Sequence, residues 1–138
     1  METIVTVING VQFSAESRGH RIISDQPVES GGADGGMTPP ELLLASLGTC
    51  AAYYAVQYLK LHKIPADDLT VRVEAEKEKS PARMSRFRIH IDHPAAAEEK
   101  HRDGLRRAAD KCLIHNTLLN TPAIDIEVES RVAAALPS

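Results

Sequence analysis

The sequence has no tryptophan and few other aromatic residues, with two phenylalanines and three tyrosines among 138 residues. Its core must therefore be built from aliphatic side chains. Cysteine is scarce as well, with two residues, and this excludes a disulfide-rich scaffold. A chain of this length can bury a core without disulfides. We therefore expect a single domain over residues 1–138.

The sequence also lacks an excess of positive charge. Sixteen Lys and Arg against nineteen Asp and Glu give a net charge of −3, whereas nucleic-acid-binding proteins carry a basic excess. Residues 1–10 lack the basic start and long apolar run of a signal peptide. The most apolar stretch, residues 42–56, is too short to span a bilayer. We expect a cytoplasmic protein with no nucleic-acid and no membrane partner.

The first quarter of the chain has the pattern of a small antiparallel sheet. Residues 3–17 predict a β-hairpin that turns at Asn9-Gly10, a dipeptide favoured in type I′ turns. Residues 20–24 predict a third strand. Residues 26–37 are punctuated by Gly and Pro and are expected to form a loop.

A long apolar helix should follow this loop. Thr38 suits the N-cap, Pro39 the first helical position and Glu41 the far side of a capping box. The helix should end near Lys63, before Pro65, and it is apolar on nearly every side. Such a helix must be covered on several sides, either by a sheet or by a second subunit.

The second half of the chain predicts two strands, a helix and a final strand. Residues 69–77 and 86–91 alternate, so the acidic outer face of one strand can pair with the basic outer face of the other. A helix is expected over residues 94–113 and a strand over residues 124–132. The order β-β-β-α-β-β-α-β indicates an α+β fold with mostly antiparallel pairing. The inward residues of the last strand would be Ile124, Ile126 and Val128.

The two cysteines fall on these helices, Cys50 in the middle of the apolar one and Cys112 near the end of the next. Free cysteines are often small core residues. The helix dipole lowers a thiol pKa only within the first turn of a helix, and Cys50 lies beyond that turn. A reactive Cys50 would therefore need a cation from elsewhere in the protein. These observations alone leave both roles for the cysteines open, packing in the core and thiol chemistry.

Two motifs around the cysteines resemble the OsmC/Ohr family of osmotically inducible and organic hydroperoxide resistance proteins. Residues 19–52, GHRIISDQPVESGGADGGMTPPELLLASLGTCAA, are similar to the conserved core of that family. Residues 112–118 fit its second motif, a Cys separated by four residues from Thr-Leu. The resemblance covers essentially the whole chain. It implies antiparallel sheets wrapped around a long central helix in an intertwined homodimer.

The resemblance also implies a peroxidase that uses both cysteines and no cofactor. The Cys50 thiolate would attack an organic hydroperoxide and become a sulfenic acid. Cys112 would then condense with it to a Cys50–Cys112 disulfide, and an external dithiol would restore the thiols. The alternative is a non-enzymatic OsmC-like dimer that binds a small apolar ligand at its interface.

In the hydroperoxide resistance branch an Arg and a Glu prepare the reactive thiolate. The Glu position falls at Pro40 here, with Glu41 one residue later. At about 100° per residue, Glu41 lies on the opposite side of a regular helix from Cys50. Glu41 is therefore either the capping residue or the group that organises a cation. Arg18 and Arg21 are candidates for that cation, supplied by a partner subunit, or they are solvated charges at strand ends.

Two further groups of side chains have possible roles. Those on the face of Cys50 would shape an apolar substrate pocket or simply pack in the core: Ser46, Leu47, Tyr53 and Tyr54. Four others are of the types that bind zinc: His90, His93, Cys112 and His115. We expect no metal site, because His90 points out of its strand and His93 precedes Pro94.

Overall fold

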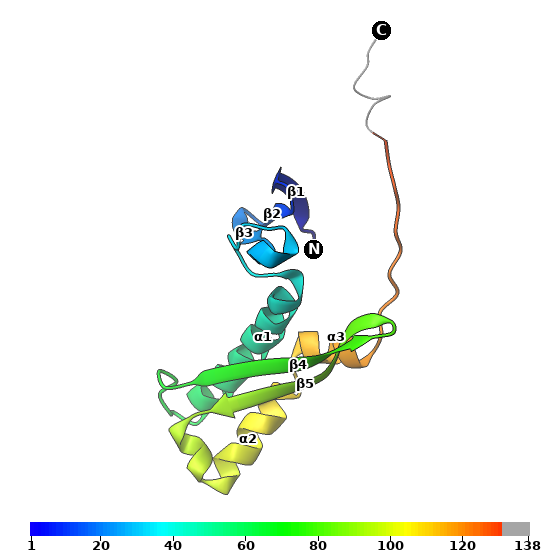
Figure 1. Ribbon diagram of the computed structural model, residues 1–138. Coiled ribbons are helices and arrows are strands. Elements are labelled where there is room, and N and C mark those ends of the chain that lie inside the picture. Colours follow the sequence, from blue (N-terminus) through cyan, green and yellow to red (C-terminus); the bar gives the residue numbers. More distant parts are fainter. Residues whose placement is uncertain (131–138) are drawn as a thin grey trace.

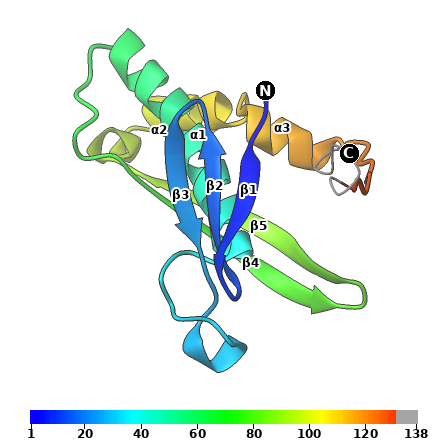
Figure 2. The same ribbon diagram turned by 90° about the horizontal axis from the view of Figure 1, so that it is seen from above.

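An antiparallel three-stranded sheet forms the N-terminal part of the computed structural model, which describes residues 1–130. Its strands are β1 (Ile4–Asn9), β2 (Gln12–Ser17) and β3 (His20–Ser24). They lie side by side in the order β1-β2-β3 (Figure 2). Gly10 takes a φ of 56° in the first turn, a conformation that glycine adopts without strain. The predicted hairpin and third strand are confirmed.

The loop after β3 is organised around the side chain of Asp25, which is 1% exposed. Its carboxylate accepts hydrogen bonds from the N–H groups of Gln26 (2.7 Å), Gly35 (2.9 Å) and Ala33 (3.3 Å), and from the Gln12 amide (3.0 Å). The N–H groups of Gly35 and Gln26 are the main cause of a lowered Asp25 pKa. A Cβ at Gly35 would crowd both Asp25 and Gln12. The loop includes the short 3₁₀ helix η1 (Val28–Ser30).

The apolar helix α1 (Pro39–Leu61) starts where the sequence predicts. The Thr38 hydroxyl oxygen accepts a hydrogen bond from the Glu41 N–H (3.5 Å) and donates one to the Glu41 carboxylate (2.9 Å). By length and composition alone α1 could cross a membrane, a property that core helices of soluble domains share. Here α1 packs on β4 and α2. Its buried residues are Leu47, Ala51, Ala55 and Leu59.

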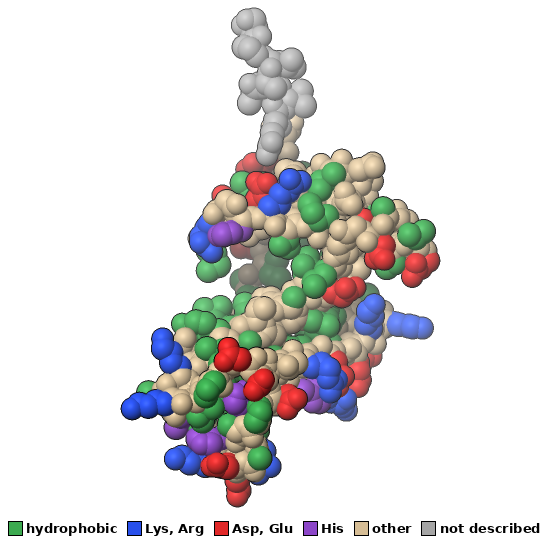
Figure 3. Space-filling model, turned by 90° about the vertical axis from the view of Figure 1, so that its left-hand side faces the viewer, with side chains coloured by type: hydrophobic (Ala, Val, Ile, Leu, Met, Phe, Trp, Pro, Cys, Tyr) green, Lys and Arg blue, Asp and Glu red, His purple; other side chains and the backbone are tan. Residues whose placement is uncertain are grey.

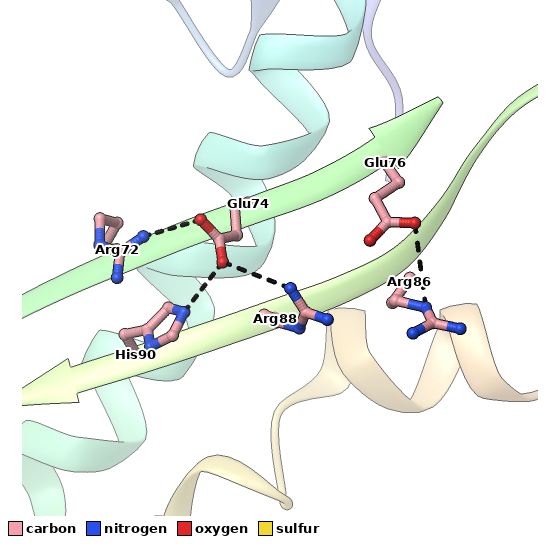
Figure 4. A network of polar contacts seen from close by, with 6 residues as sticks. All are labelled: Arg72, Glu74, Glu76, Arg86, Arg88 and His90. Carbon is pink, nitrogen blue, oxygen red and sulfur yellow. Dashed lines mark hydrogen bonds and ion pairs between the residues drawn. The ribbon is translucent and has the colours of Figure 1, made fainter. Parts of the chain in front are cut away.

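A long hairpin of β4 (Thr70–Lys79) and β5 (Ala82–Asp92) covers one side of α1 (Figure 1). Gly48 allows the close approach, because its Cβ position would lie 3.0 Å from the Val73 side chain. The outer face carries the expected charge pairs around Glu74 and Glu76 (Figure 4). Glu74 contacts Arg72 (2.8 Å), His90 (3.2 Å) and Arg88 (3.9 Å), and Glu76 contacts Arg86 (3.9 Å). Such exposed pairs each contribute under about 1 kcal/mol.

The helix predicted over residues 94–113 is wrong as a single element. The structure divides this region into η2 (Pro94–Ala97) and α2 (Glu99–Ala109), and begins α3 (Leu113–Leu119) after a break. The extended backbone of Glu98 separates η2 from α2. Cys112 also leaves the helical conformation and becomes the N-cap of α3. The second cysteine therefore opens a helix instead of closing one.

The strand predicted over residues 124–132 is also not formed within residues 1–130. Residues 121–130 lead away from α3 in an extended path (Figure 1). The three residues expected to face inward, Ile124, Ile126 and Val128, are 79%, 87% and 94% exposed. A strand needs a neighbour, and no described strand pairs with this segment. Residues 131 and 132 lie outside the described part.

The core lies where α1, α2 and the β4–β5 hairpin meet. Ala55, Leu59 and Leu105 are its fully buried members, with Tyr58, Leu69 and Ile91 packed against them. Burying a leucine side chain contributes about 1.5–3 kcal/mol. Other apolar residues, on β1 and β3, remain exposed: Ile4, Val5, Val7, Ile8 and Ile22. Figure 3 shows hydrophobic side chains along the hollow between the N-terminal part and the β4–β5 layer.

Candidate functional site

The two cysteines meet in the structure. Cys50 is half-buried in the middle of α1, and Cys112 is completely buried at the N-cap of α3. Both are free thiols, and each is near enough to shift the pKa of the other. The contact between α1 and α3 thus brings together two thiols that are far apart in the sequence.

The surroundings of Cys50 favour its thiolate. Burial by itself raises the pKa of the Cys50 thiol, but three hydrogen bonds outweigh it. The Cys112 side chain contributes most, followed by the backbone N–H groups of Ile114 and Leu113, and the pKa of Cys50 falls below its ordinary value. Within one chain the groups that lower the pKa of Cys50 are hydrogen-bond donors of α3 and the Cys112 side chain, and the need of a reactive Cys50 for a cation stays a prediction.

The pKa of Cys112 moves in the opposite direction. Burial raises the pKa of its thiol, and the neighbouring Cys50 raises it further. The His115 N–H donates a hydrogen bond to Cys112 Sγ at 3.4 Å, a smaller opposing effect. The pair is therefore asymmetric, with the pKa lowered for Cys50 and raised for Cys112. Such an asymmetry suits a nucleophile and a second thiol that responds to it.

Two cavities meet at His115, three residues after Cys112. The larger one, of about 530 Å³, is mostly apolar and reaches Leu47 on the buried side of α1. The smaller one, of about 280 Å³, lies between β5 and α2 and has Ile91 and Leu105 in its wall. The remaining main lining residues of the larger cavity are Met84, Ser85, Arg86, Phe87, Ile89, Leu118 and Leu119.

The other predicted pocket residues are spread around α1. Leu47 is 1% exposed and lines the larger cavity. Tyr54 lines a separate surface depression beside Leu113. Tyr53 is 59% exposed and packs edge-on against Tyr54, with ring centroids 5.2 Å apart. Ser46 is exposed. Only part of the predicted set therefore surrounds one cavity.

The structure does not bring Glu41 or Arg18 to Cys50 within one chain. Glu41 is bonded to Thr38 at the start of α1. Arg18 lies in the β2–β3 turn with a φ of 53°, in the sheet that stands above the start of α1 (Figure 1). The Arg21 guanidinium donates a hydrogen bond to Ser14 at 2.8 Å within that sheet. Among residues 1–130 no cation is found among the groups that shift the Cys50 pKa.

The four side chains considered for a metal are not gathered. His90 is bonded to Glu74 on the outer face of β5. Both ring nitrogens of His93 bond backbone groups, the N–H of Ala95 and the carbonyl of Pro65. His93 is therefore a structural residue that joins η2 to the segment that follows α1. Residues 1–130 contain no group of three side chains placed to hold a metal ion.

Comparison with known proteins places this geometry in context. The sequence model of a family described as OsmC-like protein matches residues 31–128. A Psychrobacter arcticus protein assigned to the osmotic stress and detoxification response has a similar structure, with a TM-score of 0.75, 23% identity, and coverage of 83% of this chain and 85% of that one. No curated protein matches the chain.

Two further solved structures share the fold. An OsmC-like protein of Mycoplasma pneumoniae gives a TM-score of 0.66 at 19% identity, with 88% of this chain and 89% of that one covered. An organic hydroperoxide resistance protein of Elizabethkingia anophelis gives 0.64 at 21% identity, with 88% and 90% covered. These likenesses establish a common architecture for nearly the whole of each chain.

Proposed function

Because the chain belongs to the OsmC-like protein family, we propose that it is a thiol-dependent peroxidase that reduces organic hydroperoxides. The observation that carries the proposal is that the packing of α3 on α1 brings Cys50 and Cys112 together, near enough for each thiol to shift the pKa of the other. A structural neighbour is named an organic hydroperoxide resistance protein, which suits this substrate class.

In the first step the Cys50 thiolate attacks the terminal oxygen of the hydroperoxide. The O–O bond breaks, a Cys50 sulfenic acid forms, and the alkoxide takes a proton and leaves as an alcohol. The lowering of the Cys50 pKa increases the fraction of thiolate. A mostly apolar cavity is lined by Leu47, one turn before Cys50, and by His115, three residues after Cys112, and we propose that it accepts the organic group of the hydroperoxide.

In the second step Cys112 attacks the sulfur of the Cys50 sulfenic acid. A disulfide forms, the S–O bond breaks, and water leaves. The effect of each thiol on the pKa of the other supports a second sulfur within reach of the first. An external dithiol then reduces the disulfide by thiol–disulfide exchange and returns both thiols.

We further propose that the working form is a homodimer. One chain leaves apolar residues exposed on several elements, such as Val7 on β1, Tyr53 on α1 and Ile126 after α3. Patches on separate elements of one chain match the interface of two copies that exchange segments better than a single small ligand. A second copy would also be able to bring Arg18 to Cys50. Light scattering that gives the mass of one chain, 15.0 kDa, at micromolar concentration would contradict this.

The peroxidase proposal is tested by adding an organic hydroperoxide to the reduced protein. Two thiols should be lost per chain, and mass spectrometry should find a disulfide between Cys50 and Cys112. Cys50→Ser should abolish turnover, whereas Cys112→Ser should allow one oxidation and then stop at a sulfenic acid open to over-oxidation. The proposal fails if the wild type reacts no faster than free cysteine and neither variant differs from it.

One observation favours the alternative of a non-enzymatic dimer that binds a small apolar ligand. Glu41 is bonded to Thr38, and no arginine contributes to the Cys50 pKa among residues 1–130. Under this alternative both thiols react slowly, at rates set by exposure. The large cavity would then bind an apolar fluorescent probe without any consumption of hydroperoxide.

A further inference from the structure

The smaller cavity, of about 280 Å³ between β5 and α2, has an apolar wall and no cysteine in its lining. Leu105 is a buried member of the core, and Ile91 and Ala96 pack against that core. The core of one chain therefore forms the wall of this cavity. The apolar lining residues, from β5, η2 and α2, are Ile89, Ile91, Ala96, Leu105 and Ala109.

The charged lining residues of the cavity lie on one face of α2 and its end. Arg102, Arg106 and Asp110 follow one another at intervals of four residues, the spacing of neighbours on a helix surface. All three are exposed. At 1.5 Å per residue, Asp110 lies about 12 Å along the helix from Arg102, and His115 from α3 is the remaining polar lining residue. The two arginines therefore form a positive end of the cavity, away from the carboxylate.

These two guanidinium groups are available to a ligand. In residues 1–130 the Arg102 guanidinium has no hydrogen bond and no ion pair. Arg106 Nη2 lies 3.9 Å from Asp103 Oδ1 in an exposed pair, an arrangement that contributes little energy. A guanidinium presents parallel N–H donors that match the two oxygens of a carboxylate.

We propose that this cavity binds an aliphatic carboxylate of medium chain length. The tail lies against the apolar wall, and the carboxylate lies between Arg102 and Arg106. Because one water molecule occupies about 30 Å³ of the liquid, the cavity has room for a tail of several carbon atoms. The inference goes beyond the proposed peroxidase, since this site holds neither thiol.

The test is isothermal titration of the reduced full-length protein with octanoate, and with octan-1-ol and octylamine as matched neutral and cationic probes. Octanoate should bind more tightly than the alcohol by about fivefold or more, because charged hydrogen bonds are the stronger ones, and the amine should bind most weakly. From butanoate upward, each added CH₂ that is buried should strengthen binding by about fourfold. The gain should stop once the tail fills the cavity.

Two arginine variants locate the carboxylate. Arg102→Gln should weaken octanoate binding by about fivefold or more. Arg107→Gln removes an arginine of α2 that does not line the cavity, and it should change the affinity by less than about twofold because an exposed charge at a distance is screened.

The tail is located by a third variant and by NMR. Ala96→Leu should fill part of the cavity and abolish binding, with the denaturation midpoint showing that this variant is folded. In the wild type, nuclear Overhauser effects should connect the octanoate methylenes to the methyl groups of Ile89 and Ile91, a measurement that needs no variant.

Equal affinities for octanoate and octan-1-ol, or for Arg102→Gln and Arg107→Gln, would overturn the inference. So would Overhauser effects that reach only Leu118 and Leu119 of the larger cavity. Cys50→Ser should bind octanoate like the wild type, and a loss of binding in this variant would place the carboxylate at the thiols instead. A wild type that binds octanoate but consumes no hydroperoxide would reject only the proposed function.

Discussion

Gly104 lies directly against the ring of Tyr58, so that a Cβ at Gly104 would overlap with the phenol carbons and the hydroxyl. The Tyr58 ring cannot simply swing away. Its hydroxyl is hydrogen-bonded to His101 Nδ1 at 3.0 Å, and its face packs against His62 with ring centroids 4.2 Å apart. The missing side chain at Gly104 therefore sets how closely α2 approaches α1.

We predict that Gly104→Ala destabilises the protein by about 1–3 kcal/mol, the usual cost of overpacking. In a solvent-exposed helix the same change would stabilise the protein by about 1 kcal/mol. The sign of the change in unfolding free energy therefore shows whether Gly104 is in close contact with Tyr58. The measurement is the free energy of unfolding from urea titration. In a Tyr58→Phe background one of the clashing atoms is absent, and the cost should be smaller. An unchanged or increased stability of Gly104→Ala would show that α2 sits farther from α1.

A second prediction concerns Asp25 and pH. Because the pKa of Asp25 is lowered in the folded state, its carboxylate stabilises the fold at pH values above its unfolded pKa of 3.8. This stabilisation is lost as the pH falls through the folded pKa. Asp25→Asn should therefore lower the urea midpoint at pH 7, and the difference from the wild type should narrow below pH 3.8. Asp34→Asn, at an exposed position of the same loop, should have little effect at any pH.

The lowered pKa of Cys50 can be tested by removing one donor. Leu113 is the first residue of α3, where proline is tolerated, and Cys112 before it is extended. Leu113→Pro deletes an N–H that bonds Cys50, so the pKa of Cys50 should rise and its alkylation by iodoacetamide at pH 7 should slow by severalfold. Leu113→Ala keeps the N–H and should react like the wild type. Equal alkylation rates for the two variants would show that the Leu113 N–H does not lower the pKa of Cys50.

A substitution at Glu41 can distinguish a helix-capping role of this residue from a catalytic role. Its carboxylate accepts a hydrogen bond from the Thr38 hydroxyl on the exposed start of α1. Glu41→Gln should therefore cost about 0.5 kcal/mol or less in stability and change the rate of hydroperoxide reduction by less than about twofold. A large loss of rate with normal stability would show that Glu41 organises a cation for Cys50 in the assembled protein.

The elements with strong local signals were predictable, and those set by longer-range contacts were not. Asn9-Gly10 defines the first turn and Thr38-Pro39 the start of α1, because each residue type matches one backbone conformation. The break at Cys112 has no such signal, since residues 105–111 contain neither Gly nor Pro and cysteine is an unusual N-cap. The sequence therefore pointed to both cysteines but not to the α3 donors that lower the Cys50 pKa.

The sequence gives no indication that the Nδ1 atom of His115 is buried without a hydrogen-bond partner; it shows only that His115 follows Cys112 by three residues. The strand predicted over residues 124–132 is not formed within residues 1–130 for a different reason. Its alternation is clear, but alternation specifies a strand only where a neighbour exists, and the described residues supply none to Ile126. Arg18 cannot be placed beside Cys50 by sequence for the same reason, because its sheet stands apart from the middle of α1.

The contact between α1 and α3 joins two points separated by about 60 residues of chain. A bond between Cys50 and Cys112 would close that stretch into a ring and remove many conformations from the unfolded ensemble, by about 4 kcal/mol in the chain-entropy treatment. Reduction of the disulfide would restore those conformations to the unfolded ensemble. The protein would therefore tolerate heat and denaturant better in its oxidised form, and each catalytic cycle would pass through its least robust state whenever both thiols are restored.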